Sequence, residues 1–148
     1  MAYIAAAFAL LQGVDIVDQQ FGWPETLQRG IMLALVLANQ RRYRESTKEM
    51  ARALALDPND VTTNFWNGTI LVIVGYRKRG AAALDHVLQL DPLLPNALVW
   101  RARIHTADGD LEIAERQLQR AAEGGHSFVG LGQYKLDLAR GDHAAAVT

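Results

Sequence analysis

Apolar residues recur along the chain at the three- and four-residue spacing of α-helices. The clearest example is the stretch 43–58, whose apolar and small residues keep to one side of a helix: Tyr43, Met50, Ala53, Leu54 and Leu56. Leu56-Asp57-Pro58 predicts the end of this helix, because proline cannot extend a helix and disfavours α conformation in the residue before it.

The same ending returns as Leu90-Asp91-Pro92, so Pro58 and Pro92 define a period of about 34 residues. A fixed period with a helix-breaking end indicates a helical repeat. The period predicts helices at about 24–40, 43–56, 61–74, 81–90, 95–107, 111–122 and 128–140, with another beginning at 143. Residues 75–80 are expected to form a turn, and Asp60 and Gly124-Gly125 are expected to begin and end helices.

The stretch from Thr63 to Val74 is ambiguous on local evidence. Its β-branched residues and the dipeptide Asn67-Gly68 are typical of a β-hairpin. The repeat register favours a helix, because the equivalent segments before and after are helical in pattern. The first residues are alanine-rich, and Tyr3 to about Gln20 is predicted to form one helix, or one and a half.

The repeats resemble tetratricopeptide repeats, which pair two antiparallel helices over about 34 residues. Small residues match in the first helix of each repeat, at Ala34, Gly68 and Ala102. Small residues also match early in the second helix, at Ser46, Gly80, Ala114 and Ala146. The Gly-Asp turns at 109–110 and 141–142 and the closing prolines match as well. The family's usual first-helix tryptophan is absent at Gly30, Asn64 and Leu98.

The resemblance implies an all-α, right-handed superhelical solenoid of antiparallel helical hairpins. We expect a single domain of residues 1–148, with a partial N-terminal unit at 1–23, repeats at about 25–58, 59–92 and 93–126, and a partial repeat at 127–148. The chain also resembles, more weakly, the C-terminal repeat regions of bacterial multidomain regulators that carry winged-helix or cyclase-type domains. This resemblance lies in Ala2–Ala7, Phe21–Glu25 and Ala53–Pro58.

Repeat solenoids bind partners on a concave groove, which the first helix of each unit lines. The register places the following residues there: Gln28, Ile31, Leu35, Asn39, Thr62, Phe65, Thr69, Ile73, Asn96, Val99, Arg103 and Ala107. This groove is mostly apolar and suits an extended peptide or a helix of another protein, or else the N-terminal helix or a neighbouring domain fills it. Arg103 is its one cation, so a terminal carboxylate is not expected to bind.

Trp66 and Trp100 lie one repeat apart, and packing between successive repeats is favoured for them over a role as binding anchors. His105 falls on the apolar side of its helix and is expected to be half-buried and hydrogen-bonded. Six cations in two successive turns form a predicted basic edge: Arg41, Arg42, Arg44, Arg77, Lys78 and Arg79. A solvated edge is favoured for them over a site for a phosphate-rich partner.

Composition adds few constraints. The net charge of −1 gives no global field for nucleic acid, and the absence of cysteine excludes disulfides and thiolate metal sites. No histidine pair has metal-site spacing, and no phosphate loop or nucleophile–base set is apparent, so we expect no metal, no cofactor and no enzyme activity. The apolar start at 2–11 is too short to span a membrane, and a cytoplasmic location is favoured.

The sequence therefore predicts a protein–protein interaction module that acts as a scaffold or regulatory domain. Two alternatives stay open: the sensory part of a bacterial transcription regulator, and a secretion or assembly chaperone. Self-association through the C-terminal unit is also expected, because 143–148 is too short to complete a helix that would cover Phe128, Leu131, Leu136 and Leu138.

Overall fold

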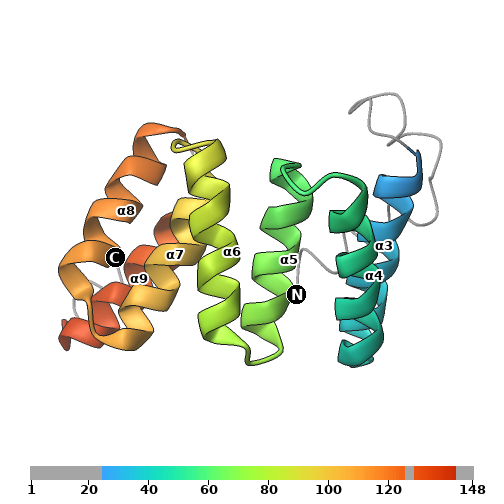
Figure 1. Cartoon of the computed structure of the whole chain (residues 1–148). Helices are drawn as coiled ribbons and strands as arrows, with labels where there is room; N and C mark the ends of the chain where they lie inside the picture. The colour runs from blue at the N-terminus through green and yellow to red at the C-terminus, as the bar shows by residue number, and fades with distance from the viewer. Residues whose placement is uncertain (1–24, 126–128, 143–148) are drawn as a thin grey trace. The chain divides into compact units, whose positions relative to one another are not determined.

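The computed structural model describes residues 25–125 and 129–142 of the 148-residue chain, and the side chains from residue 29 onward (Figure 1). This part of the chain is all-α, as predicted, and contains no strand. The helices are α3 (Glu25–Asn39), α4 (Tyr43–Leu56), α5 (Val61–Ile73), α6 (Arg77–Leu90), α7 (Pro95–Asp108), α8 (Leu111–Glu123) and α9 (Val129–Arg140).

Local signals in the sequence account for most helix ends. The Asp60 carboxylate accepts a hydrogen bond from the backbone N–H of Thr63 at 2.6 Å and so caps α5. Gly109 ends α7 with a φ of 88°, and Gly125 follows α8 with a φ of 74°. Both Leu-Asp-Pro sequences end their helices as predicted.

The structure differs from the sequence prediction at the start of α6. The predicted turn at 75–80 is too long, because the helix begins at Arg77 rather than Ala81. Only Gly75, with a φ of 96°, needs a turn conformation, and arginine and lysine at 77–79 are good helix formers. The β-hairpin alternative for 63–74 is excluded, since α5 runs through it.

The chain divides into two compact units, Met1–Tyr76 and Arg77–Thr148. The division falls between α5 and α6, which are the two helices of the predicted repeat 59–92. Each unit is described by itself below, and the single domain of residues 1–148 stays a prediction.

In the first unit, α3 and α4 pack closely as an antiparallel pair, and α5 packs on both (Figure 1). The core contains Ile31, Ala34, Met50, Ala53 and Ile70. Ala34 and Ser46 let the two backbones approach, and the buried Ser46 hydroxyl donates a hydrogen bond to the Ala34 carbonyl at 2.6 Å. The small residues that carry the repeat resemblance therefore lie at the contact between the paired helices.

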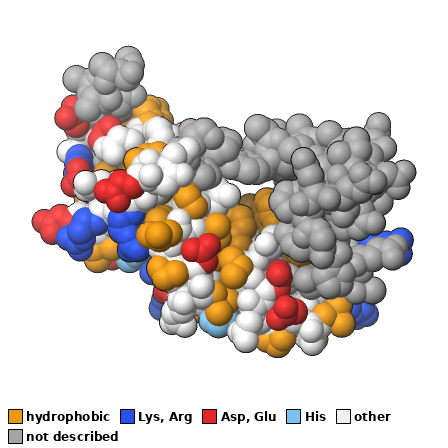
Figure 2. All heavy atoms as spheres, turned by 90° about the horizontal axis from the view of Figure 1, so that it is seen from above, with side chains coloured by type: hydrophobic (Ala, Val, Ile, Leu, Met, Phe, Trp, Pro, Cys, Tyr) orange, Lys and Arg blue, Asp and Glu red, His pale blue; other side chains and the backbone are white. Residues whose placement is uncertain are grey.

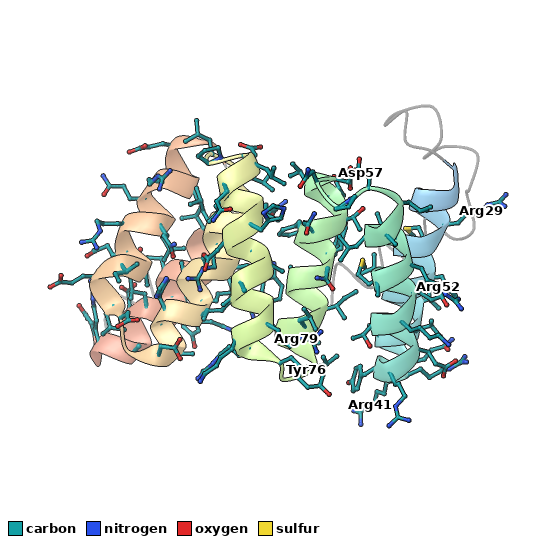
Figure 3. The ribbon with its side chains drawn as sticks, in the orientation of Figure 1. Arg29, Arg41, Arg52, Asp57, Tyr76 and Arg79 are labelled. Carbon is teal, nitrogen blue, oxygen red and sulfur yellow. The ribbon has the colours of Figure 1, made fainter. Side chains whose placement is uncertain are left out.

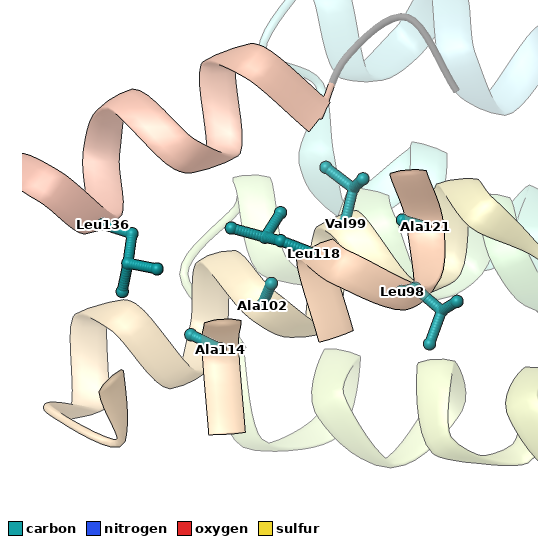
Figure 4. Packing of buried hydrophobic residues seen from close by; sticks show 7 residues of the cluster. All are labelled: Leu98, Val99, Ala102, Ala114, Leu118, Ala121 and Leu136. Carbon is teal, nitrogen blue, oxygen red and sulfur yellow. The ribbon is translucent and has the colours of Figure 1, made fainter. Parts of the chain in front are cut away.

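In the second unit, α7 and α8 form the equivalent pair, and α6 and α9 pack beside it. Figure 4 shows the core, to which α7, α8 and α9 contribute Leu98, Val99, Ala102, Ala114, Leu118, Ala121 and Leu136. Ala102 and Ala114 occupy the places that Ala34 and Ser46 hold in the first unit. Both are buried, so the close helix contact recurs with different residues.

The apolar residues of α9 are covered unequally. Leu136 was expected to be incompletely covered, but it is fully buried against α7 and α8. Leu131 and Leu138 do remain exposed, at 52% and 38%. Phe128 lies outside the described residues. The expected self-association stays a prediction, and a charge at the exposed Leu131 would test it without disturbing the core.

Gly132 permits the contact between α9 and α8. A Cβ atom added at Gly132 would lie 2.4 Å from Leu118 Cδ2, whereas one added at Gly130 would meet nothing within 4 Å. Alanine is the better helix former by about 1 kcal/mol. The two glycines of α9 therefore offer a matched test of this packing.

We predict that Gly132→Ala lowers the free energy of unfolding by about 1 kcal/mol, because overpacking outweighs the gain in helix propensity. Gly130→Ala should raise it by up to about 1 kcal/mol. Denaturant unfolding of both variants beside the parent checks this. Equal stabilisation by the two substitutions would contradict the packing of α9 on Leu118.

Candidate functional site: the first helices of the repeats

Several residues of the predicted groove are buried in their units. Ile31 belongs to the core of the first unit, and Phe65 and Val99 are exposed by only 8% and 7%. Thr69 is also buried, and its hydroxyl donates a hydrogen bond to the Trp66 carbonyl at 3.0 Å. Burial of these four side chains leaves less apolar surface for a partner than the sequence suggests.

Other predicted groove residues stay accessible. Ile73 is 60% exposed, Asn39 and Ala107 are also exposed, and Leu35, Thr62 and Asn96 are half-buried. The side chain of Gln28 lies outside the described residues. The groove as a continuous surface draws on both units and stays a prediction, so its accessible residues are considered unit by unit.

In the second unit the predicted groove residue with the most distinctive setting is Arg103, on α7. Its guanidinium stacks on the ring of Trp100, with Cζ 4.3 Å from the ring centroid. Burial lowers the pKa of Arg103. An arginine held by cation–π contact and partly shielded from water is oriented for interaction with an anion.

Lys135, on α9, is a second cation close to Arg103, and it was not among the predicted residues. The charge of Arg103 lowers the pKa of Lys135, with desolvation as the smaller cause. The packing of α9 against α7 therefore brings a second cation near this predicted groove residue. The predicted groove contains no residue of the partial repeat 127–148, to which α9 belongs.

The two tryptophans that lie one repeat apart have different settings. Trp66 packs against the core of the first unit, and its ring meets Phe65 edge-on with centroids 5.3 Å apart. Since that core comes from α3, α4 and α5, the prediction of packing between successive repeats is confirmed for Trp66. Trp100 is half-buried and instead supports Arg103.

His105 has the setting that its position predicts. Its side chain is 16% exposed, and Nδ1 lies 3.3 Å from an Asp110 carboxylate oxygen. His126 and His143 lie outside the described residues. Within the described ranges no group of three or more histidine or carboxylate side chains could hold a metal ion. None of the helices in these ranges is long and apolar enough to cross a membrane.

The cations of the predicted basic edge are divided between the units, three in each. Arg42 forms an ion pair with Glu45 through Nε at 2.8 Å, and Arg77 pairs with Asp108 at 2.8 Å. Figure 3 shows Arg41 at the end of α3 and Arg79 at the start of α6. Carboxylates that neutralise two of the six cations support a solvated edge more than a phosphate site.

The face of the molecule shown in Figure 2 has no large patch of charged side chains of a single sign. On the face in Figure 2, hydrophobic side chains alternate with charged groups of both signs. The distribution agrees with the net charge of −1. On the face shown, sequence-independent binding to nucleic acid therefore has no electrostatic support.

No protein-family model matches the sequence, and no curated protein matches it. Solved structures do match. A tetratricopeptide repeat protein from Parabacteroides merdae superimposes with a TM-score of 0.72 at 15% sequence identity, and the match covers 97% of this chain. The fold is that of the tetratricopeptide repeat. The chain spans 60% of that protein's length.

The tetratricopeptide repeat fold also relates the chain to a bacterial chaperone. The Yersinia enterocolitica type III secretion chaperone SycD, in complex with a peptide of the translocator YopD, matches with a TM-score of 0.67 and 19% identity, over 82% of this chain and 97% of that one. SycD solved as an alternative dimer matches with a TM-score of 0.68 and 19% identity, over 82% of this chain and 96% of that one. At such identities the similarity establishes the fold alone.

We predict that Arg103→Gln raises the pKa of Lys135, because removal of the neighbouring charge removes the largest cause of its depression. Titration of the Lys135 side chain by NMR measures the change. Arg101→Gln is the matched control, since Arg101 lies on the same helix but pairs with Asp85 at 2.6 Å. An unchanged Lys135 pKa in Arg103→Gln would show that the two cations do not interact.

Proposed function

We propose that the chain is a protein-interaction module that binds a peptide or helix of a partner protein through the first helices of its repeats. The observation that carries the proposal is the group formed by Arg103, Trp100 and Lys135 in the second unit. Arg103 is stacked on an aromatic ring and Lys135 lies near enough to feel its charge, so an anionic group would stabilise both cations.

The partner segment that fits combines apolar side chains with a carboxylate. The carboxylate would lie at Arg103 and Lys135, where it would relieve the repulsion that lowers the Lys135 pKa. The exposed Ala107, a predicted groove residue on the same helix as Arg103, would contact an apolar side chain of the segment. This differs from the expectation from sequence, which counted Arg103 as the one cation of the groove and did not expect a terminal carboxylate to bind.

A secretion or assembly chaperone is the second candidate. The similarity to SycD, which is solved with a peptide of a translocator, favours it over a transcription regulator. For this chain the chaperone function would require a co-purifying substrate that becomes insoluble without it. The regulator alternative would require a DNA-binding or cyclase-type domain in the parent gene.

We predict that affinity capture from the source cell, followed by mass spectrometry, yields a partner whose recovery falls at least tenfold with Arg103→Glu. Reversing one of two cations removes attraction for the partner's carboxylate and adds repulsion. The matched control is Arg116→Glu, the same charge change at an exposed position of the second helix α8. Equal recovery with both variants would contradict the proposed site.

A further inference from the structure

The first unit has a shallow hollow of about 300 Å³ between α3 and α4. Its lining is mainly apolar and consists of Arg29, Gly30, Leu33, Glu49, Arg52, Ala53 and Leu56. Leu33 and Leu56 are 47% and 64% exposed, and Figure 3 shows Arg29 and Arg52 on the same side of the α3–α4 pair. None of these residues belongs to the predicted groove.

The hollow exists because the floor lacks large side chains. A Cβ atom added at Gly30 would lie 3.4 Å from Ala53 Cβ, so two small residues meet there. Two periods later along the chain, Leu98 and Ala121 occupy the same places on α7 and α8. There the larger Leu98 is buried in the core.

In the second unit α6 and the turn after it cover the place that corresponds to the hollow. Leu88 of α6 packs against the core of the α7–α8 pair. The Asp85 carboxylate of α6 accepts a bond from Arg101 Nε at 2.6 Å. Arg120 donates to the Pro92 carbonyl at 3.0 Å. These contacts show which residues meet when the second helix of one repeat, here α6, covers the helical hairpin of the next repeat, here α7 and α8.

The period relates two of these contacts to pairs of residues near the N-terminus, while Leu88 becomes the polar Gln20. Pro24 precedes Pro58 by one period, as Pro58 precedes Pro92. Shifted back by two periods, the pair Arg120 and Pro92 becomes Arg52 and Pro24, with the same residue types.

The ion pair also has a counterpart. Arg101 and Asp85 become Leu33 and Val17, so both members of a charged pair change to apolar residues together. A concerted change of this kind agrees with contact between residues 17 and 33, since a charge kept at only one of the two positions would lose its ion-pair partner. Buried Leu84 of α6 becomes Ile16, a second apolar residue in the same register.

We propose that the hollow is the docking site of the chain's own residues 9–22, which pack on α3 and α4 as α6 packs on α7 and α8. Val17 then contacts Leu33, and Ile16 lies over Gly30. The segment is tethered for this contact, because Pro24 directly precedes α3.

Charge supports the same occupant. Asp15 and Asp18 are the only charged side chains among residues 1–24. They flank Ile16 and Val17, and Arg29 and Arg52 line the hollow, where Arg52 also pairs with Glu49. An acidic segment with an apolar centre is complementary to an apolar floor with arginines at its rim. The docking is independent of the partner-binding function proposed above.

Thiol cross-linking in the full chain tests the docking, because the parent has no cysteine and two introduced thiols are the only ones. The test variant is Val17→Cys with Leu33→Cys. Asp85→Cys with Arg101→Cys is the positive control, since those side chains touch. Gln19→Cys with Leu33→Cys is the negative control, because two residues further along a helix a side chain points about 200° away.

Each variant is treated with a short bismaleimide at low protein concentration, after circular dichroism has shown that it is folded. We expect the 17/33 pair to form an intramolecular cross-link within a few-fold of the 85/101 rate, and at least tenfold faster than the 19/33 pair. A 17/33 rate no faster than that of the 19/33 pair would overturn the proposal. A cross-linked dimer as the main product would also overturn it, because a second copy would then occupy the hollow.

Discussion

The close approach of the two helices within a hairpin is the constraint on which the structure depends. Helix axes come within such range only where the facing side chains are small. Ala34 and Ser46 meet this condition in the first unit, and Ala102 and Ala114 meet it in the second. The hydrogen bond from Ser46 to the Ala34 carbonyl satisfies a buried hydroxyl at the contact, so the small polar residue adds no unpaired donor.

The architecture was predictable because local and long-range signals agree. Proline after α4 and α6, aspartate before α5 and glycine after α7 each fix a helix end by backbone chemistry that needs no tertiary information. The 34-residue period then correctly predicted a helix for α5, where local β-propensity favoured a β-hairpin. The start of α6 was missed because a glycine-rich turn signal at 75–80 outweighed the helix propensity of Arg77 and Lys78.

The candidate site was less predictable, for a physical reason. Register identifies which helix a residue lies on, but exposure depends on how far neighbouring elements cover it. Thr69 and Ile31 share a predicted surface with Ile73, yet two are buried and one is exposed. Lys135 could not be placed beside Arg103 from spacing alone, because their proximity comes from the packing of α9 on α7.

The central claim, that small residues recurring at the repeat period set the contact between paired helices, is tested most directly by denaturant unfolding of Ala34→Leu and Ala102→Leu. Each should lower the free energy of unfolding by about 1–3 kcal/mol, because both sites are fully packed. The same substitution at the exposed Ala51 and Ala122 should change it by less than about 0.5 kcal/mol. If Ala34→Leu and Ala102→Leu unfold at the parent's denaturant concentration, the close contact does not determine the fold.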